Sequence, residues 1–151
     1  MKINRLLPLG ALLLTLGLSS GANAAETGEM SVYKTPWCGC CESWAQAMTG
    51  AGYNVKTIDL EDLSQVKAMA GVTDELEGCH TAIIAGYVLE GHVPLQAIEK
   101  LLLEKPELRG IAVPGMPSGA LGMNYDENAD YTVYGFFTDT AKQPVVFYQA
   151  G

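Results

Sequence analysis

The sequence predicts an α/β domain in which a mixed β-sheet is flanked by helices. Of its 151 residues, 48% are apolar and 17% are charged, which suits one domain with a modest core and excludes a disordered chain. Short apolar runs typical of strands alternate with segments whose apolar residues recur at helical spacing. In order, these segments give a β-α-β-α-β-β-α pattern, followed by a Gly- and Pro-rich region and two further strand-like stretches.

The pattern opens with a β-α-β unit and a second helix. We expect a strand over residues 30–34, a helix over 42–49 and a strand over 53–60. Trp44 and Met48 lie four residues apart and therefore share one face of the first helix. The second helix is capped by Asp62 or Ser64 and ends at Gly71. Strands joined through a helix pair in parallel, so the first two strands should be parallel neighbours.

An apolar hairpin and a third helix complete the pattern. Residues 81–85 and 87–90 flank Gly86 and predict two antiparallel strands. Pro94 stands where proline opens a helix, and Pro106 follows the end of that helix. The buried stripe of this third helix is expected to consist of Leu95, Ile98, Leu101 and Leu102.

The C-terminal part of the chain differs in character. Residues 110–130 are rich in Gly, Pro, Ser and Asn and predict a loop, whereas 131–137 and 144–148 predict a terminal β-hairpin. We therefore expect three parts along the chain. They are a cleaved secretory signal peptide at 1–24, a domain at 25–109, and an extension at 110–151 that packs on the same domain.

The first 24 residues have the features of a secretory signal peptide. Lys2 and Arg5 precede the apolar run 6–18, and Ala-Asn-Ala at 22–24 offers a cleavage site. The run has 13 residues, whereas a membrane span needs about 20, so it indicates a signal and not an anchor. We expect an exported protein with no membrane attachment after cleavage, in a compartment where disulfides persist.

The net charge of the chain limits the classes of ligand that it is expected to bind. It carries 9 basic and 17 acidic residues, a net charge of −8, and removal of Lys2 and Arg5 with the signal leaves 7 basic residues and a charge of −10. A protein this acidic repels nucleic acid and anionic lipid, so we expect neither as a partner. The charge favours cations as ligands.

Three cysteines, Cys38, Cys40 and Cys41, lie between the first strand and the first helix. The dipole at a helix start lowers thiol pKa values, which favours both redox chemistry and metal binding. The string Trp-Cys-Gly-Cys-Cys at 37–41 resembles the thioredoxin active site Trp-Cys-Gly-Pro-Cys, with Cys40 in place of proline. A third thiol invites exchange between alternative disulfides, whereas closely spaced thiolates suit soft Cu(I) ions and can bridge more than one.

Five further residues are candidates for the same site. Cys79 and His80 directly precede the strand at 81–85, and in the thioredoxin arrangement these positions pack against the active-site cysteines. His92 is weaker evidence, because a histidine before a helix is more often a polar or surface residue. Met116 and Met123 lie in a loop with little core to fill, and thioethers are soft copper ligands; both are candidates, and Met116 is favoured over Met123.

Three other interpretations stay open at this point. The four cysteines of an exported chain can form two ordinary disulfides. Cys38 and Cys41 can act as the attacking and resolving thiols of a thiol–disulfide oxidoreductase. The cysteines, with or without a histidine, can also hold a structural zinc ion, although three of the sulfurs share one loop.

Four strings together resemble the family of exported copper-resistance proteins called CopG. They are Cys-Gly-Cys-Cys at 38–41 followed by Trp44, Gly-Cys-His-Thr at 78–81, Glu-Gly-His-Val-Pro at 90–94, and Val-Pro-Gly-Met-Pro at 113–117. The resemblance implies a thioredoxin-like mixed sheet flanked by helices, with a C-terminal metal-site loop and a β-hairpin extension. It also implies a periplasmic protein of Gram-negative bacteria with a redox role in handling Cu(I) and Cu(II).

These arguments define a copper site and its partners. We expect a monomer that binds copper, with several ions in one site, and that works with periplasmic copper efflux or redox proteins. The expected copper ligands are Cys38, Cys40, Cys41, Cys79, His80, His92, Met116 and Met123.

Overall fold

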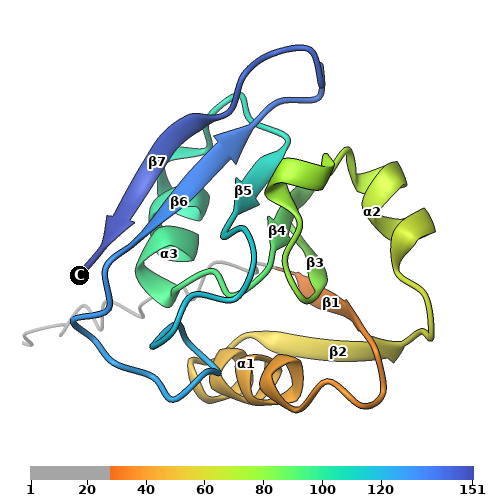
Figure 1. Ribbon diagram of the computed structural model, residues 1–151, viewed down its shortest axis with the longest axis vertical. Helices are drawn as coiled ribbons and strands as arrows, with labels where there is room; N and C mark the ends of the chain where they lie inside the picture. The colour runs from red at the N-terminus through yellow and green to blue at the C-terminus, as the bar shows by residue number, and fades with distance from the viewer. Residues whose placement is uncertain (1–27) are drawn as a thin grey trace, which may run out of the picture.

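The fold is seen in a computed structural model, which describes residues 28–151. Within these residues, seven strands form one mixed sheet in the order β2-β1-β3-β4-β5-β6-β7, with three α-helices packed on it (Figure 1). The elements are β1 Glu29–Lys34, α1 Gly39–Gly50, β2 Asn54–Asp59, α2 Ser64–Ala70, a 3-10 turn Asp74–Leu76, β3 Thr81–Ile84, β4 Tyr87–Glu90, α3 Leu95–Glu104, β5 Gly110–Ala112, β6 Tyr131–Phe136 and β7 Val145–Ala150. The signal peptide predicted at 1–24 lies outside the described residues.

The first seven predicted elements are all present, and they confirm the predicted α/β class. β1 pairs in parallel with β2 and antiparallel with β3, which in turn pairs antiparallel with β4. The β3–β4 hairpin closes through Ala85 and Gly86, with φ of 49° and 84°. Two successive residues at positive φ are typical of the tight turn whose twist matches that of paired strands.

The helices cover both faces of the sheet. Trp44 and Met48 of α1 and Ile98 and Leu101 of α3 belong to one core cluster, so these two helices share a face. Ala70 of α2 belongs to a second cluster on the opposite face. Neighbouring residues of a strand point to opposite faces, and β4, β5 and β6 contribute residues to both clusters. No helix within residues 28–151 is long and apolar enough to cross a membrane.

The region predicted as a loop over 110–130 begins with a strand, which corrects that expectation. β5 pairs in parallel with β4 and antiparallel with β6, so it joins the two halves of the sheet. Its three residues, Gly-Ile-Ala, are too few to show a strand period, and only pairing with both neighbours stabilises them. The predicted terminal hairpin is confirmed, and because of β5 its strands β6 and β7 continue the same sheet.

Candidate metal centre

The three neighbouring cysteines lie in the first turn of α1 and not in a loop before it. α1 begins at Gly39, whereas the sequence predicted a start at residue 42, and Cys38 is the residue that caps it. The amide of Glu42 donates to the carbonyl oxygen of Cys38 at 3.2 Å, which closes this turn. Glycine and cysteine are poor helix formers, so propensity alone does not reveal the early start. We call residues 38–41 the cysteine turn.

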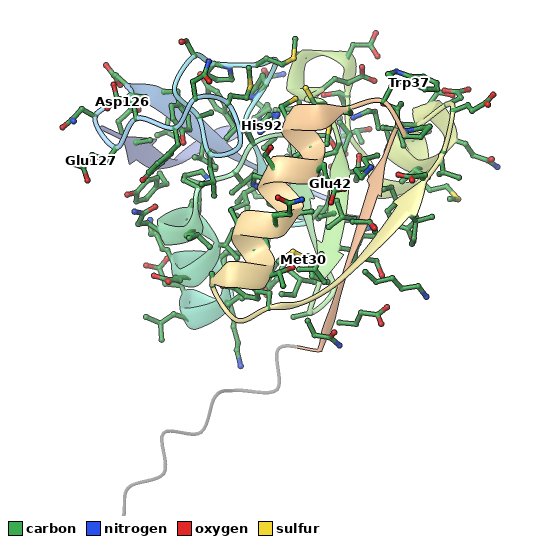
Figure 2. All side chains as sticks on the ribbon, turned by 90° about the horizontal axis from the view of Figure 1, so that it is seen from below. Met30, Trp37, Glu42, His92, Asp126 and Glu127 are labelled. Carbon is green, nitrogen blue, oxygen red and sulfur yellow. A yellow bond between two sulfur atoms is a disulfide. The ribbon has the colours of Figure 1, made fainter. Side chains whose placement is uncertain are left out.

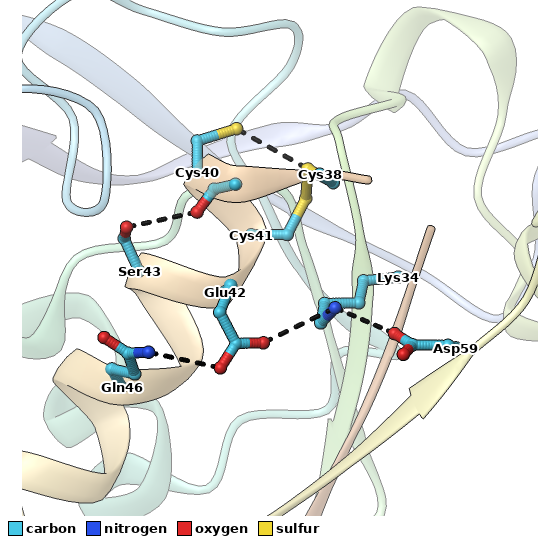
Figure 3. A network of polar contacts seen from close by, with 9 residues as sticks. Lys34, Cys38, Cys40, Cys41, Glu42, Ser43, Gln46 and Asp59 are labelled. Atoms are coloured by element: carbon cyan, nitrogen blue, oxygen red, sulfur yellow. Dashed lines mark hydrogen bonds and ion pairs between the residues drawn. A yellow bond between two sulfur atoms is a disulfide. The ribbon is translucent and has the colours of Figure 1, made fainter. Parts of the chain in front are cut away.

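The structure brings Cys79 to the cysteine turn, as the sequence predicted. The Sγ atoms of Cys38, Cys40, Cys41 and Cys79 all lie within 4.8 Å of one another, and we call these four atoms the sulfur cluster. Cys38 and Cys41 form a disulfide, while Cys40 lies with its Sγ 3.6 Å from that of Cys38 (Figure 3). Cys40 and Cys79 are free thiols. The four cysteines therefore form a single disulfide, Cys38–Cys41, and the interpretation with two disulfides is wrong.

The spacing of the sulfur cluster suits a thiolate-bound metal. Metal–sulfur bonds of about 2.3 Å in a tetrahedral site place neighbouring sulfurs about 3.8 Å apart. All four sulfurs can serve as thiolate ligands only after the Cys38–Cys41 disulfide is reduced. Burial, together with the nearby Cys40, raises the pKa of Cys79 to about 11. Metal binding to Cys79 therefore releases a proton at neutral pH.

The two histidines lie next to each other in the interior. His80 and His92 are both fully buried, and their rings meet edge to face with centroids 5.1 Å apart. His80 also packs on Trp44 of α1, with a centroid distance of 4.5 Å. Figure 2 shows His92 near the first turn of α1. The prediction that His80 faces the three cysteines stays a prediction: its ring packs on Trp44 of the same helix, and the group of ligand atoms within 4.8 Å of one another contains the four sulfurs and neither histidine.

Three of the four ring nitrogens of these histidines have no hydrogen-bond partner within residues 28–151. Neither nitrogen of His80 has a hydrogen-bond partner within residues 28–151, and neither does Nε2 of His92. Nδ1 of His92 lies 2.7 Å from the carbonyl oxygen of Leu121; because a carbonyl only accepts, Nδ1 carries the hydrogen and Nε2 keeps its lone pair. Burial lowers the pKa of His80 well below its usual range and also lowers the pKa of His92, so both rings are neutral at pH 7.

The loop that carries the two methionines contacts both cysteine-bearing segments. A Cβ placed on Gly122 would lie 2.7 Å from the carbonyl oxygen of Cys40, and Met123 follows directly. Gly115 forms a bridge with Gly78, and Met116 follows that contact. Met116 is 61% exposed while Met123 is half-buried, so burial favours Met123 as a ligand, opposite to the order expected from the sequence.

An ion-paired lysine lies beside the cysteine turn. Lys34 at the end of β1 donates to Asp59 at 2.8 Å and lies 3.4 Å from Glu42 of α1, as Figure 3 shows. The hydrogen bond to Asp59 raises the pKa of Lys34, against the lowering effect of burial. Trp37, directly before the turn, is 70% exposed and points outward (Figure 2).

Sequence reasoning missed three residues that surround this centre. Lys67 of α2 is buried and paired with Glu90 of β4, and the carbonyl of Leu121 binds His92. Spacing could have revealed Lys67, because it follows Leu63 by four residues and precedes Ala70 by three, which places it on the buried face of α2. No sequence signal marks a backbone carbonyl such as that of Leu121.

Comparison with known proteins finds two solved structures of similar sequence. One, titled "Copper resistance protein copG- Form 1", is 36% identical with a TM-score of 0.72, covering 80% of this chain and 95% of that chain. The other, titled "Copper resistance protein copG- Form 2", is 35% identical with a TM-score of 0.73, covering 82% and 98%. A family model described as "Protein of unknown function, DUF411" matches residues 76–123. A search of curated proteins found no match.

Proposed function

Because the chain belongs to the CopG copper resistance protein family, we propose that it binds copper ions at the sulfur cluster and acts as a periplasmic redox protein on Cu(I) and Cu(II). The observation that carries this proposal is the convergence of Cys38, Cys40, Cys41 and Cys79 within 4.8 Å. The three cysteines of the turn are neighbours in sequence, but Cys79 reaches them only through the fold.

The donor set favours copper over hard cations. Thiolate is a soft ligand that selects Cu(I), and sulfurs this close can bridge two or more ions. His80 and His92 offer neutral imidazole nitrogens that lie outside the group of four sulfurs, and imidazole also suits Cu(II). Met123 and Met116 are further candidates for a thioether ligand. Together these groups can accommodate both oxidation states.

Formation and reduction of the Cys38–Cys41 disulfide can be coupled to the oxidation state of two copper ions. When the thiols of Cys38 and Cys41 form their S–S bond, they release two protons and two electrons. The two electrons reduce two Cu(II) ions to Cu(I). Cys40 and Cys79 do not take part in that bond and remain to hold the product. In the opposite direction, two Cu(I) ions return the electrons to the disulfide and restore both thiolates.

One observation favours a second candidate function, thiol–disulfide exchange with another protein. The disulfide lies at the start of a helix, and the neighbouring Trp37 is 70% exposed, as a docking residue would be. In this alternative Cys40 has no part, since exchange needs only Cys38 and Cys41. The role of Cys40 therefore separates the two functions.

The decisive experiment measures copper on reduced protein under anaerobic conditions. We expect more than one Cu(I) per chain, lower stoichiometry in each single Cys→Ser variant, and weaker thiolate-to-copper absorption. Reduced protein given excess Cu(II) should yield two Cu(I) per Cys38–Cys41 disulfide formed. The matched control is Cys38→Ser/Cys41→Ser, which cannot form this disulfide and should yield less Cu(I). Insulin reduction that depends on Cys38 and Cys41, with copper binding unaffected by Cys40→Ser, would establish thiol–disulfide exchange as the function. One zinc ion per chain in protein purified from its native compartment would establish the structural zinc site.

We further propose that residues 1–24 direct export and are removed, and that the mature protein is a monomer serving periplasmic efflux or redox partners. Expression of the full chain followed by cell fractionation tests the first statement. Mass spectrometry should find a periplasmic product that begins at Ala25. A cytoplasmic product that retains Met1 would refute export.

A further inference from the structure

A buried ion pair lies directly beside Cys79 and has no part in the function proposed above. The carboxylate of Glu90, at the end of β4, is fully buried and accepts from Nζ of Lys67, from the amide of Gly78 at 2.8 Å and from the hydroxyl of Thr81 at 2.6 Å. Lys67 Nζ also donates to the carbonyl oxygen of Gly78 at 3.0 Å. One ion pair therefore binds both backbone polar groups of the residue that precedes Cys79.

Stability alone is a poor explanation for such a pair. Removing two charges from water is unfavourable, and apolar side chains of similar volume often serve a fold as well or better. Here one partner comes from α2 and the other from β4, elements that already pack through the apolar cluster containing Ala70 and Val88. What the pair adds to this packing is a fixed position for the backbone at Gly78.

Contacts on either side of Cys79 complete this fixation. The amide of Gly115 donates to the carbonyl of Glu77 at 2.7 Å, and the amide of Gly91 donates to the carbonyl of His80 at 2.8 Å. Gly78 also lies against Gly91 so closely that a Cβ on Gly78 would be 2.4 Å from the Cα of Gly91. The chain is thus held before and after Cys79.

We propose that Lys67 and Glu90 are positioning residues, which hold the Gly78 backbone so that the thiol of Cys79 stays within reach of the other three sulfurs. Their value to copper binding rests on the function proposed above. The positioning itself is a property of the metal-free protein. It also connects two parts of the site, because Glu90 is two residues before His92 on the same chain segment.

The test replaces both charges together in copper-free protein with the Cys38–Cys41 disulfide formed. Lys67→Met with Glu90→Met removes the pair and its hydrogen bonds while nearly conserving volume, and it leaves no unpaired buried charge. Only Cys40 and Cys79 are then free to react with N-ethylmaleimide, and peptide mass spectrometry measures each rate. We expect the rate at Cys79 to rise about tenfold and the rate at Cys40 to change less than about twofold, with cooperative thermal unfolding retained.

Lys34→Met is the matched control, because Lys34 is equally buried and ion-paired but contacts neither Gly78 nor Cys79. It should leave the Cys79 rate within about twofold of the parent. A double variant that unfolds cooperatively and labels Cys79 at the parent rate would overturn the proposal. So would an equal rise in the Lys34→Met control.

A second measurement on the unsubstituted protein decides the matter if the double variant does not fold. The amide of Gly78 donates to Glu90, so its hydrogen exchange should be at least about 100-fold slower than that of an unprotected loop amide. Exchange at the unprotected rate would show that the carboxylate does not hold this segment. Neither the N-ethylmaleimide rates nor the hydrogen exchange requires copper. A protein that binds no copper would therefore contradict the proposed function without affecting the test of positioning.

Discussion

The site contains two Gly-Cys pairs, Gly39-Cys40 and Gly78-Cys79, which are held in different ways. Gly39 and Cys40 lie in the first turn of α1, where a Cβ on Gly39 would meet nothing within 4 Å. Gly78 and Cys79 lie before β3, where a Cβ on Gly78 would collide with the backbone of Gly91. The backbone at Gly39 therefore faces open space, whereas the backbone at Gly78 is enclosed by other segments.

The difference shows that the two halves of the sulfur cluster depend on different parts of the sequence. The cysteine turn is closed by hydrogen bonds between near neighbours, such as that from Glu42 to Cys38. The Cys79 segment is held by residues from α2, β4 and the loop after β5. Disturbing the fold at a distance should therefore move Cys79 before it moves Cys40.

The strongest test of this comparison inserts one methyl group into each pair. Gly78→Ala should lower the free energy of unfolding by about 3 kcal/mol, because its Cβ meets backbone atoms that cannot yield cheaply. Gly39→Ala should be neutral or stabilise by up to about 1 kcal/mol, because alanine is the better helix former. Urea unfolding of both variants measures the two values. Equal changes in the free energy of unfolding would show that the two glycines are equally tolerant of a side chain.

Reduction of the Cys38–Cys41 disulfide should have the next largest effect. The bond closes a short loop in the unfolded chain, and its loss should lower the free energy of unfolding by about 2 kcal/mol. Urea unfolding of copper-free protein with and without reductant measures this change. The control is Cys38→Ser/Cys41→Ser, which should not respond to the reductant. A parent that does not respond either would mean that the disulfide adds no stability.

The segment that carries Cys79 and His80 can be tested by the pH dependence of the free energy of unfolding. Burial lowers the folded-state pKa of His80, so the stability it contributes is present above about pH 6.5 and is lost as pH falls toward that folded pKa. Between pH 7.5 and 5.5 the copper-free parent should lose about 1 kcal/mol more than His80→Leu. Burial raises the pKa of Glu90, but this group is present in both proteins and its effect cancels. Parallel curves for the two proteins would contradict the lowered pKa.

The smallest effect is expected at the ion pair beside the cysteine turn. Glu42 lies 3.4 Å from Lys34, but its side chain is 47% exposed, so Glu42→Gln should change the free energy of unfolding by less than about 0.5 kcal/mol. The same substitution at the fully buried Glu90 removes the partner of a buried cation and should cost about 3 kcal/mol or more. Thermal unfolding of the two variants tests the contrast. A large loss at Glu42 would mean that the cysteine turn, too, depends on distant charges.

Elements with a local pattern could be predicted from the amino-acid sequence alone. Apolar spacing predicted α1, α3 and the β3–β4 hairpin, and the Cys-Gly-Cys-Cys string predicted three thiols at one helix start. Such features depend on residues a few positions apart, and a period of two or 3.6 residues records them.

Features that depend on long-range contacts could be identified only in the folded protein. The burial of Lys67, the strand β5, the tautomer of His92 and the greater burial of Met123 over Met116 all arise from segments far apart in sequence. None of them has a period or a motif, since each depends on which backbone groups and side chains become neighbours when the sheet forms. A buried charge or a three-residue strand is stable only when its distant partner is present.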